Sequence, residues 1–268
     1  MNAPVKTEKM LSRKEGGVGY LTFNNPERHN AVSLDMWEAA EGYLEDFKTD
    51  PAIRVLVVSG AGGKAFVSGA DISKFENERS SKEDIDRYNI AVDKANTAVY
   101  EFPKPTIAMI RGYCIGGGVG LALCCDMRIC SDNSKFGVPA AKLGLGYGFK
   151  GIKKLVDVVG PSYAKEIFYT ARQFTAQEAQ MMGLVNRVLP ADGDALEKFV
   201  KEYAETISGN APLTVDAVKY IVGQVVTAES ERDLQKAADM VANCFASDDY
   251  KEGRQAFMEK RKPQFKGK

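Results

Sequence analysis

The sequence predicts an α/β protein in which buried strands alternate with helices and the C-terminal part is helical. Two runs rich in β-branched residues, at 54–58 and 106–110, are typical of strands covered on both faces. Between them, apolar residues recur every three or four positions from Ile85 to Phe102, which is the spacing of a helix that buries one face. Beyond residue 193 only the helical spacing remains. Alternating strands and helices indicate an α/β architecture with a helical extension.

The N-terminal part predicts a hairpin followed by a helix. Residues 9–15 and 18–23 flank two glycines, a pattern typical of a tight turn between two strands. Ser33 is a residue type that caps helices well, so we expect a helix to begin directly after it. Pro51 cannot continue that helix, which therefore ends before it.

The middle of the chain predicts two more strands around a glycine turn. The strand at 54–58 runs into a glycine-rich loop, and the long helix that follows stops before Pro103. The strand at 106–110 is then followed by a glycine turn, a short helix and another strand near 127–131.

The pattern changes after about residue 148. The Gly-Pro pair at 160–161 predicts the start of a helix, because proline is favoured at the first helical position. The sequence T-A-Q-E at 175–178 is a capping box that starts another helix, and Gly183 predicts its end. A last short strand is expected at 185–188.

Two regions are therefore expected, an α/β core at 1–195 and a helical region at 196–268. The helical region carries an apolar stripe from Leu234 to Phe245, and it has no strands to bury that stripe against. Such a stripe packs on the α/β body or on another subunit, so we expect this region to mediate oligomerisation.

Composition excludes several classes of protein. The chain has 268 residues, is 44% hydrophobic, and carries 36 basic and 36 acidic residues, so it has no charge excess that would attract nucleic acid or a membrane surface. No segment resembles a secretory signal or a membrane span, so we expect a soluble, cytoplasmic protein. Five cysteines without metal-binding spacing predict reduced thiols and no metal site.

A single histidine, His29, limits the catalytic chemistry. A nucleophile activated by histidine, or a metal site with several histidines, would have to be built around this one residue. Both classes are disfavoured.

Two glycine-rich loops follow predicted strands, at 68–72 and 115–118. Free backbone N–H groups at a helix start stabilise a negative oxygen, and ligands of α/β sheets bind at the edge where parallel strands end. Glycines also serve tight turns alone, which is an equally good explanation for a single cluster. Two clusters at the ends of consecutive strands favour a binding site.

Two glycine-containing segments match nucleotide-binding motifs only in part. The segment 58–64 lacks the first glycine of a phosphate-binding loop, and Ala65 stands where serine or threonine would bind magnesium. The segment 146–151 fits the dinucleotide spacing G-x-G-x-x-G, but a poor strand precedes it and no acid follows at the required distance. A Rossmann-type oxidoreductase is therefore a minor alternative.

The chain resembles the crotonase superfamily, also called the enoyl-CoA hydratase/isomerase family, over nearly its whole length. The resemblance rests on seven ordered motifs: N-P-E-R-H-N-A at 25–31, F-V-S-G-A-D-I at 66–72, I-R-G-Y-C-I-G-G-G at 110–118, C-D at 125–126, F-G at 136–137, G-L-V-N at 183–186 and E-K-R-K-P-Q-F at 259–265. It implies a spiral of ββα turns, a C-terminal helical trimerisation region, and a homotrimer or homohexamer.

The resemblance implies an acyl-CoA substrate and a site for its thioester. In this family the backbone N–H groups at the positions of Ala70 and Gly117 form an oxyanion hole for the thioester oxygen. Coenzyme A is then part of the substrate, and no other cofactor is expected. The residues that match coenzyme A contacts of the family are Arg28, His29, Ala31, Ser68, Ala70, Asp71, Ile72, Phe257 and Lys260.

The chain departs from the family at the acid/base groups. Hydratases carry glutamates at the positions of Gly120 and Ala140, so both carboxylates are absent here. The stretch at 142–155 resembles the methylmalonyl-CoA decarboxylase branch, which presents a tyrosine at the position of Tyr147 to the substrate carboxylate. That branch has histidine at the position of Ala70, so the likeness is partial.

The resemblance implies an acyl-CoA enzyme and a lyase. Because both glutamates are replaced, at Gly120 and Ala140, we expect decarboxylation or another step that needs no base. Three further side chains, Ser68, Cys114 and Lys150, are candidates for the pocket. An enoyl-CoA hydratase with other acid/base groups is one alternative. A non-catalytic protein that binds coenzyme A is another, while balanced charge and few clustered aromatics disfavour an RNA-associated one.

Overall fold

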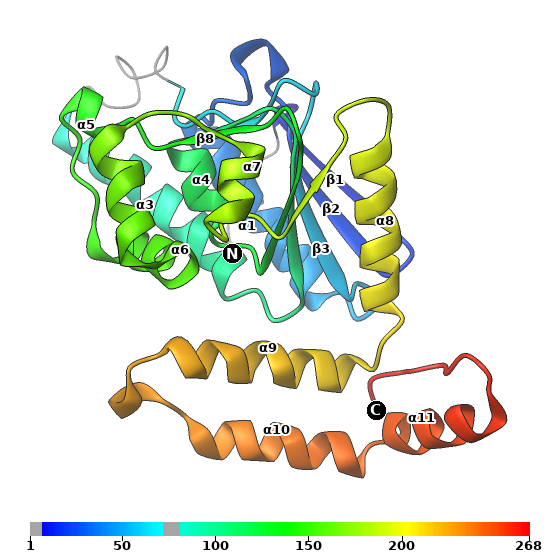
Figure 1. Cartoon of the computed structure of the whole chain (residues 1–268). Helices are drawn as coiled ribbons and strands as arrows, with labels where there is room; N and C mark the ends of the chain where they lie inside the picture. Colours follow the sequence, from blue (N-terminus) through cyan, green and yellow to red (C-terminus); the bar gives the residue numbers. More distant parts are fainter. Residues whose placement is uncertain (1–6, 72–80) are drawn as a thin grey trace.

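The structure is a computed structural model that describes residues 7–71 and 81–268. Its strands form two sheets (Figure 1). The larger sheet has the order β1-β2-β3-β5-β7-β10. Its first two strands form an antiparallel hairpin, and the others run parallel. The bounds are β1 (Met10–Glu15), β2 (Val18–Phe23), β3 (Val55–Gly60), β5 (Thr106–Ile110), β7 (Met127–Ser131) and β10 (Arg187–Leu189).

The smaller sheet interleaves with the larger one along the chain. Its order is β4-β6-β8-β9, with β4 (Ala65–Val67), β6 (Tyr113–Ile115) and β8 (Lys135–Gly137) parallel, and β9 (Phe174–Thr175) antiparallel to β8. The pairs β3 and β4, β5 and β6, and β7 and β8 each place one strand in either sheet, and helices follow each pair. The chain therefore winds as a spiral of ββα turns, and the predicted α/β class is confirmed.

Helices cover both faces of the larger sheet. Along β3, Leu56 and Val58 pack into a core shared with α1 (Leu34–Thr49), α3 (Lys82–Tyr100) and α4 (Gly117–Ala122). The alternate residues Val55 and Val57 face α8 (Ala195–Ser208) on the opposite side. Side chains of a strand alternate between faces, which explains why this run is apolar throughout. The remaining helices of the α/β body are α5 (Ala140–Leu143), α6 (Phe149–Thr170) and α7 (Ala176–Met181), and a 3-10 turn η1 covers Pro26–Arg28.

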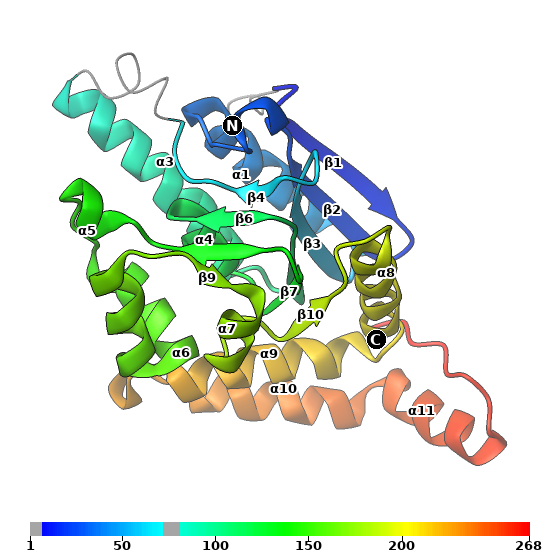
Figure 2. The same ribbon diagram turned by 45° about the horizontal axis from the view of Figure 1, so that its top comes forward.

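The last helices form a separate layer along one side of the α/β body (Figures 1 and 2). They are α9 (Pro212–Val226), α10 (Leu234–Ala246) and α11 (Asp248–Glu259), with a 3-10 turn η3 at Glu229–Glu231. Lys219 of α9 donates to Asp126 Oδ2 at 2.9 Å and to the Lys104 carbonyl at 2.8 Å, which fixes α9 to the body. In the described part of the chain, no helix is long and apolar enough to cross a membrane. The division at residue 195 stays a prediction, while α8 itself packs on the sheet.

Some local expectations need correction. The hydroxyl of Ser33 donates to Asp35 and accepts no helix N–H, although Ser33 does occupy the N-cap position. A helix already begins at Phe149, and the positive φ of Gly160 (74°) kinks it where a helix start was expected. The last strand begins two residues later and ends one residue later than predicted, and the short strands β4 and β6 lie within segments whose glycines predict loops.

Candidate active site

Two glycines from different loops lie close together at the candidate site. Gly69 follows β4 and Gly117 opens α4, just after β6. A methyl group built on Gly117 would lie 3.6 Å from the Gly69 Cα, and one built on Gly69 would lie 3.9 Å from the Gly117 nitrogen. The structure therefore brings together the two glycine loops that the sequence singled out.

The direction of the Ala70 backbone N–H follows from a bridge to Val32. Val32 forms a parallel bridge with Ala70, in which Val32 N–H donates to the Gly69 carbonyl at 2.9 Å and Asp71 N–H donates to the Val32 carbonyl at 3.1 Å. In a trans peptide the C=O and N–H groups point in opposite directions. Because the Gly69 carbonyl points toward Val32, the Ala70 N–H points away from it, and no described residue accepts it.

The N–H of Gly117 is likewise free for a ligand. Gly116 precedes α4 with φ 56° and ψ −112°, a conformation that favours glycine, and its carbonyl accepts Gly120 N–H at 3.2 Å. The Gly117 N–H belongs to the first turn, where N–H groups have no partner inside the helix. It carries the positive end of the peptide dipoles, so it suits an oxygen that gains negative charge.

Close packing places α4 against the smaller sheet. A methyl group on Gly118 would lie 2.0 Å from the Val67 carbonyl oxygen, so only glycine fits there. Gly116 N–H donates to the Gly137 carbonyl of β8 at 2.8 Å. These contacts fix where the first turn of α4 begins, and therefore where its N–H groups lie.

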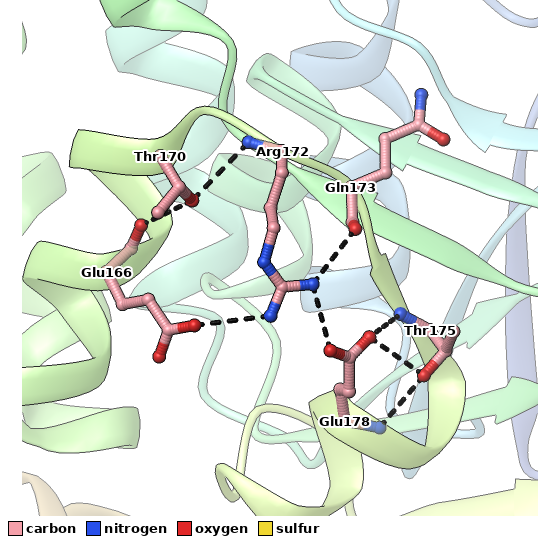
Figure 3. Close-up of polar contacts among 6 residues, drawn as sticks. All are labelled: Glu166, Thr170, Arg172, Gln173, Thr175 and Glu178. Atoms are coloured by element: carbon pink, nitrogen blue, oxygen red, sulfur yellow. Dashed lines mark hydrogen bonds and ion pairs between the residues drawn. The ribbon is translucent and has the colours of Figure 1, made fainter.

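A charged cluster braces the far edge of the smaller sheet, as Figure 3 shows. Arg172 Nη1 lies 2.8 Å from Glu178, Arg172 Nη2 lies 3.2 Å from Glu166, and its guanidinium stacks on the Phe174 ring. Glu178 also completes the predicted capping box with Thr175, and the hydrogen bond from Thr175 N–H and the pair with Arg172 lower the pKa of Glu178. The Arg172 carbonyl packs against Gly137, the residue that accepts the Gly116 N–H.

The two positions that lack carboxylates differ in their surroundings. Gly120 is partly exposed, and a methyl group built on it would meet no described atom within 4 Å. Ala140 is 5% exposed and begins α5. Space for a side chain therefore exists beside Gly120, one helical turn from Gly117 and on the same face of α4.

Tyr147 lies between α5 and α6 with 38% of its surface exposed. Its ring packs edge-on against Phe168, with ring centres 5.0 Å apart. Burial raises the pKa of Tyr147, so its phenol stays protonated at neutral pH. No described residue accepts or donates a hydrogen bond at this hydroxyl, which leaves it available to a ligand.

The residues expected near coenzyme A fall into two groups. Arg28 and His29 are exposed at the end of η1, and the His29 ring packs edge-on against Tyr113 with centres 6.0 Å apart. Ser68 Oγ donates to the Arg28 carbonyl at 3.5 Å, which places this loop beside η1. Ala31 is 8% exposed and Asp71 6%, so their side chains are buried beneath that surface, and Ile72 lies outside the described residues.

Phe257 and Lys260 lie apart from these loops within one chain. Phe257 is 82% exposed on α11, and Lys260 ends that helix with a left-handed backbone. Both views place α11 beyond α9, away from β4 and α4 (Figures 1 and 2).

Two further candidates and one alternative can now be placed. Cys114 is fully buried in β6, and burial raises its pKa well above the usual value, so it is not a pocket residue as had been considered. Lys150 is exposed in the first turn of α6. The dinucleotide-like segment 146–151 follows α5 and no strand, which removes the structural context of a Rossmann motif. Within residues 7–71 and 81–268, no group of acidic, histidine or cysteine side chains is placed to hold a metal ion.

Sequence reasoning missed Val32 and Gly69. Val32 is an apolar residue in a loop, and nothing in its neighbours marks it as the partner of a residue 38 positions away. Gly69 was part of a quoted motif, but its contact with Gly117 appears only in the fold.

Comparisons with known proteins agree on one family. The sequence model described as enoyl-CoA hydratase/isomerase matches residues 13–268. A crotonyl-CoA hydratase of Syntrophomonas wolfei is 36% identical over 96% of this chain and 98% of its own length. A peroxisomal Δ(3,5)-Δ(2,4)-dienoyl-CoA isomerase of Arabidopsis thaliana is 34% identical over 97% of both chains. A crystal structure of an enoyl-CoA hydratase/carnithine racemase from Magnetospirillum magneticum matches with a TM-score of 0.90 and 34% identity, covering 98% of this chain and 97% of that one.

Proposed function

The chain belongs to the enoyl-CoA hydratase/isomerase family, and we propose that it stabilises the enolate of an acyl-CoA thioester without carboxylate acid/base groups. The observation that carries this proposal is the close approach of Gly69 and Gly117, beside two N–H groups that have no partner among the described residues. The N–H groups of Ala70 and Gly117 would both donate to the thioester oxygen. One such donor typically lowers the barrier by about 2.7–4 kcal/mol when charge develops on that oxygen.

Decarboxylation of an α-carboxyacyl-CoA is the reaction that suits these residues best. The bond between the α-carbon and the carboxylate breaks, its electron pair moves into the thioester to form the enolate, and CO₂ leaves. The α-carbon then takes a proton from solvent. No base is needed, which fits the lack of a carboxylate at Gly120 and at Ala140. Tyr147, with a protonated hydroxyl and no protein partner, would bind the substrate carboxylate.

Hydration of an enoyl-CoA is the second candidate. Its support is the printed names of the relatives, several of which are hydratases. Hydration needs one group to activate water and one to protonate the α-carbon, each contributing about 10²–10⁴-fold. Among the described residues, the site offers Tyr147 and no carboxylate at either glutamate position, so a slow hydratase or a non-catalytic binder of coenzyme A is the expected outcome if decarboxylation is absent.

We propose further that α9, α10 and α11 assemble the protein into trimers or hexamers. Between them lies a cavity of about 730 Å³, mostly lined by apolar side chains. Large apolar side chains are also exposed on these helices, including Val218, Val222, Val225, Leu234, Phe245, Phe257 and Met258. A neighbouring copy would cover them, and the same arrangement would carry Phe257 and Lys260 to the coenzyme A of another subunit.

Parallel assays with methylmalonyl-CoA and crotonyl-CoA, read by mass spectrometry, test the reaction. The proposal expects propionyl-CoA and CO₂ from the first substrate and little hydration of the second. Tyr147→Phe should reduce CO₂ release, while Tyr169→Phe, the same change at an exposed position on α6, should not. Hydration at a rate typical of the family, without CO₂ release, would contradict the proposal.

A further inference from the structure

The Val32 carbonyl is hydrogen-bonded to the loop that carries the candidate thioester site. It accepts Asp71 N–H at 3.1 Å, while Val32 N–H donates to the Gly69 carbonyl at 2.9 Å. Val32 is thus hydrogen-bonded to the residues on both sides of Ala70. The direction of the Ala70 N–H follows from the orientation of the Gly69–Ala70 peptide, so whatever fixes Val32 also fixes that N–H.

A buried hydroxyl occupies the second acceptor position of this carbonyl. Tyr88 Oη donates to the Val32 carbonyl at 2.9 Å, and a carbonyl oxygen accepts two hydrogen bonds. Trp37 Nε1 in turn donates to Tyr88 Oη at 3.2 Å. Tyr88 and Trp37 are each 3% exposed, and Val32 is fully buried. Buried hydrogen bonds that form a network of this kind hold their partners in a defined orientation.

These residues come from two segments of the chain, and Val32 links them to a third, the loop at 69–71. Trp37 lies on α1 and Tyr88 on α3, two helices that pack against each other, while Val32 precedes α1. The hydroxyl therefore joins the helical layer to the backbone that carries the Ala70 N–H. A phenylalanine at position 88 would pack similarly but would leave the Val32 carbonyl with the Asp71 bond alone.

We propose that Tyr88 is a positioning residue for the Ala70 N–H. This inference rests on the proposed function, in which that N–H binds the thioester oxygen. Oxyanion donors act because they are already oriented when charge develops, and sites of this kind must be held within about 0.5 Å and 10–20° of the productive geometry. Tyr88 lies behind the peptide and does not touch the substrate, so its effect passes through Val32.

The test measures how strongly the site polarises a bound thioester. Butyryl-CoA labelled with ¹³C at the carbonyl has no α-carboxylate to lose, and its infrared carbonyl stretch falls when hydrogen bonds form to the oxygen. Wild type should lower the stretch on binding, and Tyr88→Phe should lower it less. With a substrate that the enzyme converts, Tyr88→Phe should lower kcat about tenfold with little change in KM. This loss is smaller than the roughly 10²–10³-fold loss expected when an oxyanion donor is deleted.

Two comparisons make the outcome decisive. Tyr43→Phe, the same change on α1 at a partly buried tyrosine with no hydrogen bond to the Val32 carbonyl, should leave the stretch and kcat unchanged. Replacing Tyr88 with 4-aminophenylalanine keeps a weaker donor and should give an intermediate shift, and this variant carries the test if Tyr88→Phe does not fold. An unchanged shift and kcat in the Tyr88 variants would overturn the role of Tyr88. No shift in wild type would instead overturn the proposed oxyanion hole.

Discussion

Replacing Gly120 with glutamate tests whether the missing carboxylate explains the expected loss of hydratase chemistry. Gly120 lies one helical turn after Gly117, and a methyl group built there meets no described atom within 4 Å. A glutamate side chain therefore has room to extend from the face of α4 that carries the Gly117 N–H. Glutamate also favours helix more than glycine does, so the variant should be about 0.5–1 kcal/mol more stable to unfolding.

The expected gain in activity follows from the role of a general acid or base. One positioned carboxylate contributes about 10²–10⁴-fold, so Gly120→Glu should raise crotonyl-CoA hydration by up to that factor above wild type. Gly120→Gln is the matched control, since it fills the same space and cannot exchange a proton at neutral pH. The assay is the loss of the enoyl-thioester absorbance, with unfolding in urea measured in parallel.

The comparison of Gly120→Glu with Gly120→Gln can show that position 120 lies away from the acyl group. If Gly120→Glu folds, binds acyl-CoA as tightly as wild type, and hydrates crotonyl-CoA no faster than Gly120→Gln, then position 120 does not face the acyl group. A gain that needs Ala140→Glu as well would show that one carboxylate is insufficient, and the reasoning about space beside Gly120 would stand.

Three other predictions concern the fold around the site. Gly118→Ala should destabilise the protein by about 1–3 kcal/mol, because its methyl group would meet the Val67 carbonyl. Gly120→Ala should instead stabilise the protein by about 1 kcal/mol. Equal effects of the two variants on urea unfolding would refute the packing of α4. Burial raises the pKa of Cys125 and raises the pKa of Cys130 to about 12, so both thiols stay protonated at pH 8. They should therefore react slowly with a thiol reagent at pH 8, and the reaction should become faster as the pH rises. Rapid labelling of both residues in the native protein at pH 8 would contradict this prediction. Arg172→Met should lower the free energy of unfolding only slightly, and by less at high salt, because its ion pairs are exposed to solvent. A large loss that salt does not reduce would mean that these ion pairs are not screened.

Local patterns predicted the main elements well because their signals lie within one element. The hairpin at β1 and β2 and the strand β5 begin and end where the alternation of turn residues and β-branched residues indicates, apart from one residue at the start of β1. The strands β4 and β6 have only three residues each, too few for any period to emerge. The first half of α6 was missed because glycines at 144, 146, 148 and 151 mask its apolar spacing.

The sequence predicted the two loops of the candidate site but not the contacts that orient their N–H groups. Glycine clusters after strands indicated a binding site, and the family motifs named Ala70 and Gly117. The contacts that orient these groups join residues far apart in the chain, such as Tyr88 with Val32, and no local pattern reports them. Phe257 and Lys260 lie at α11, away from the glycine loops of the same chain, so their proposed contact with the coenzyme A of another subunit cannot be read from one chain.

The central claim is that the site retains its oxyanion donors and works without carboxylates. The most direct measurement is CO₂ release from methylmalonyl-CoA labelled in its free carboxylate, compared among wild type, Gly117→Ala and Gly117→Pro. Gly117→Ala keeps the N–H and makes only an ordinary contact with Gly69, while Gly117→Pro removes the donor at a helical position that tolerates proline. The account predicts CO₂ release by wild type and a loss of about 10²–10³-fold in Gly117→Pro beyond any loss in Gly117→Ala. Equal rates in these two variants, or no CO₂ release by wild type alongside rapid hydration of crotonyl-CoA, would contradict it.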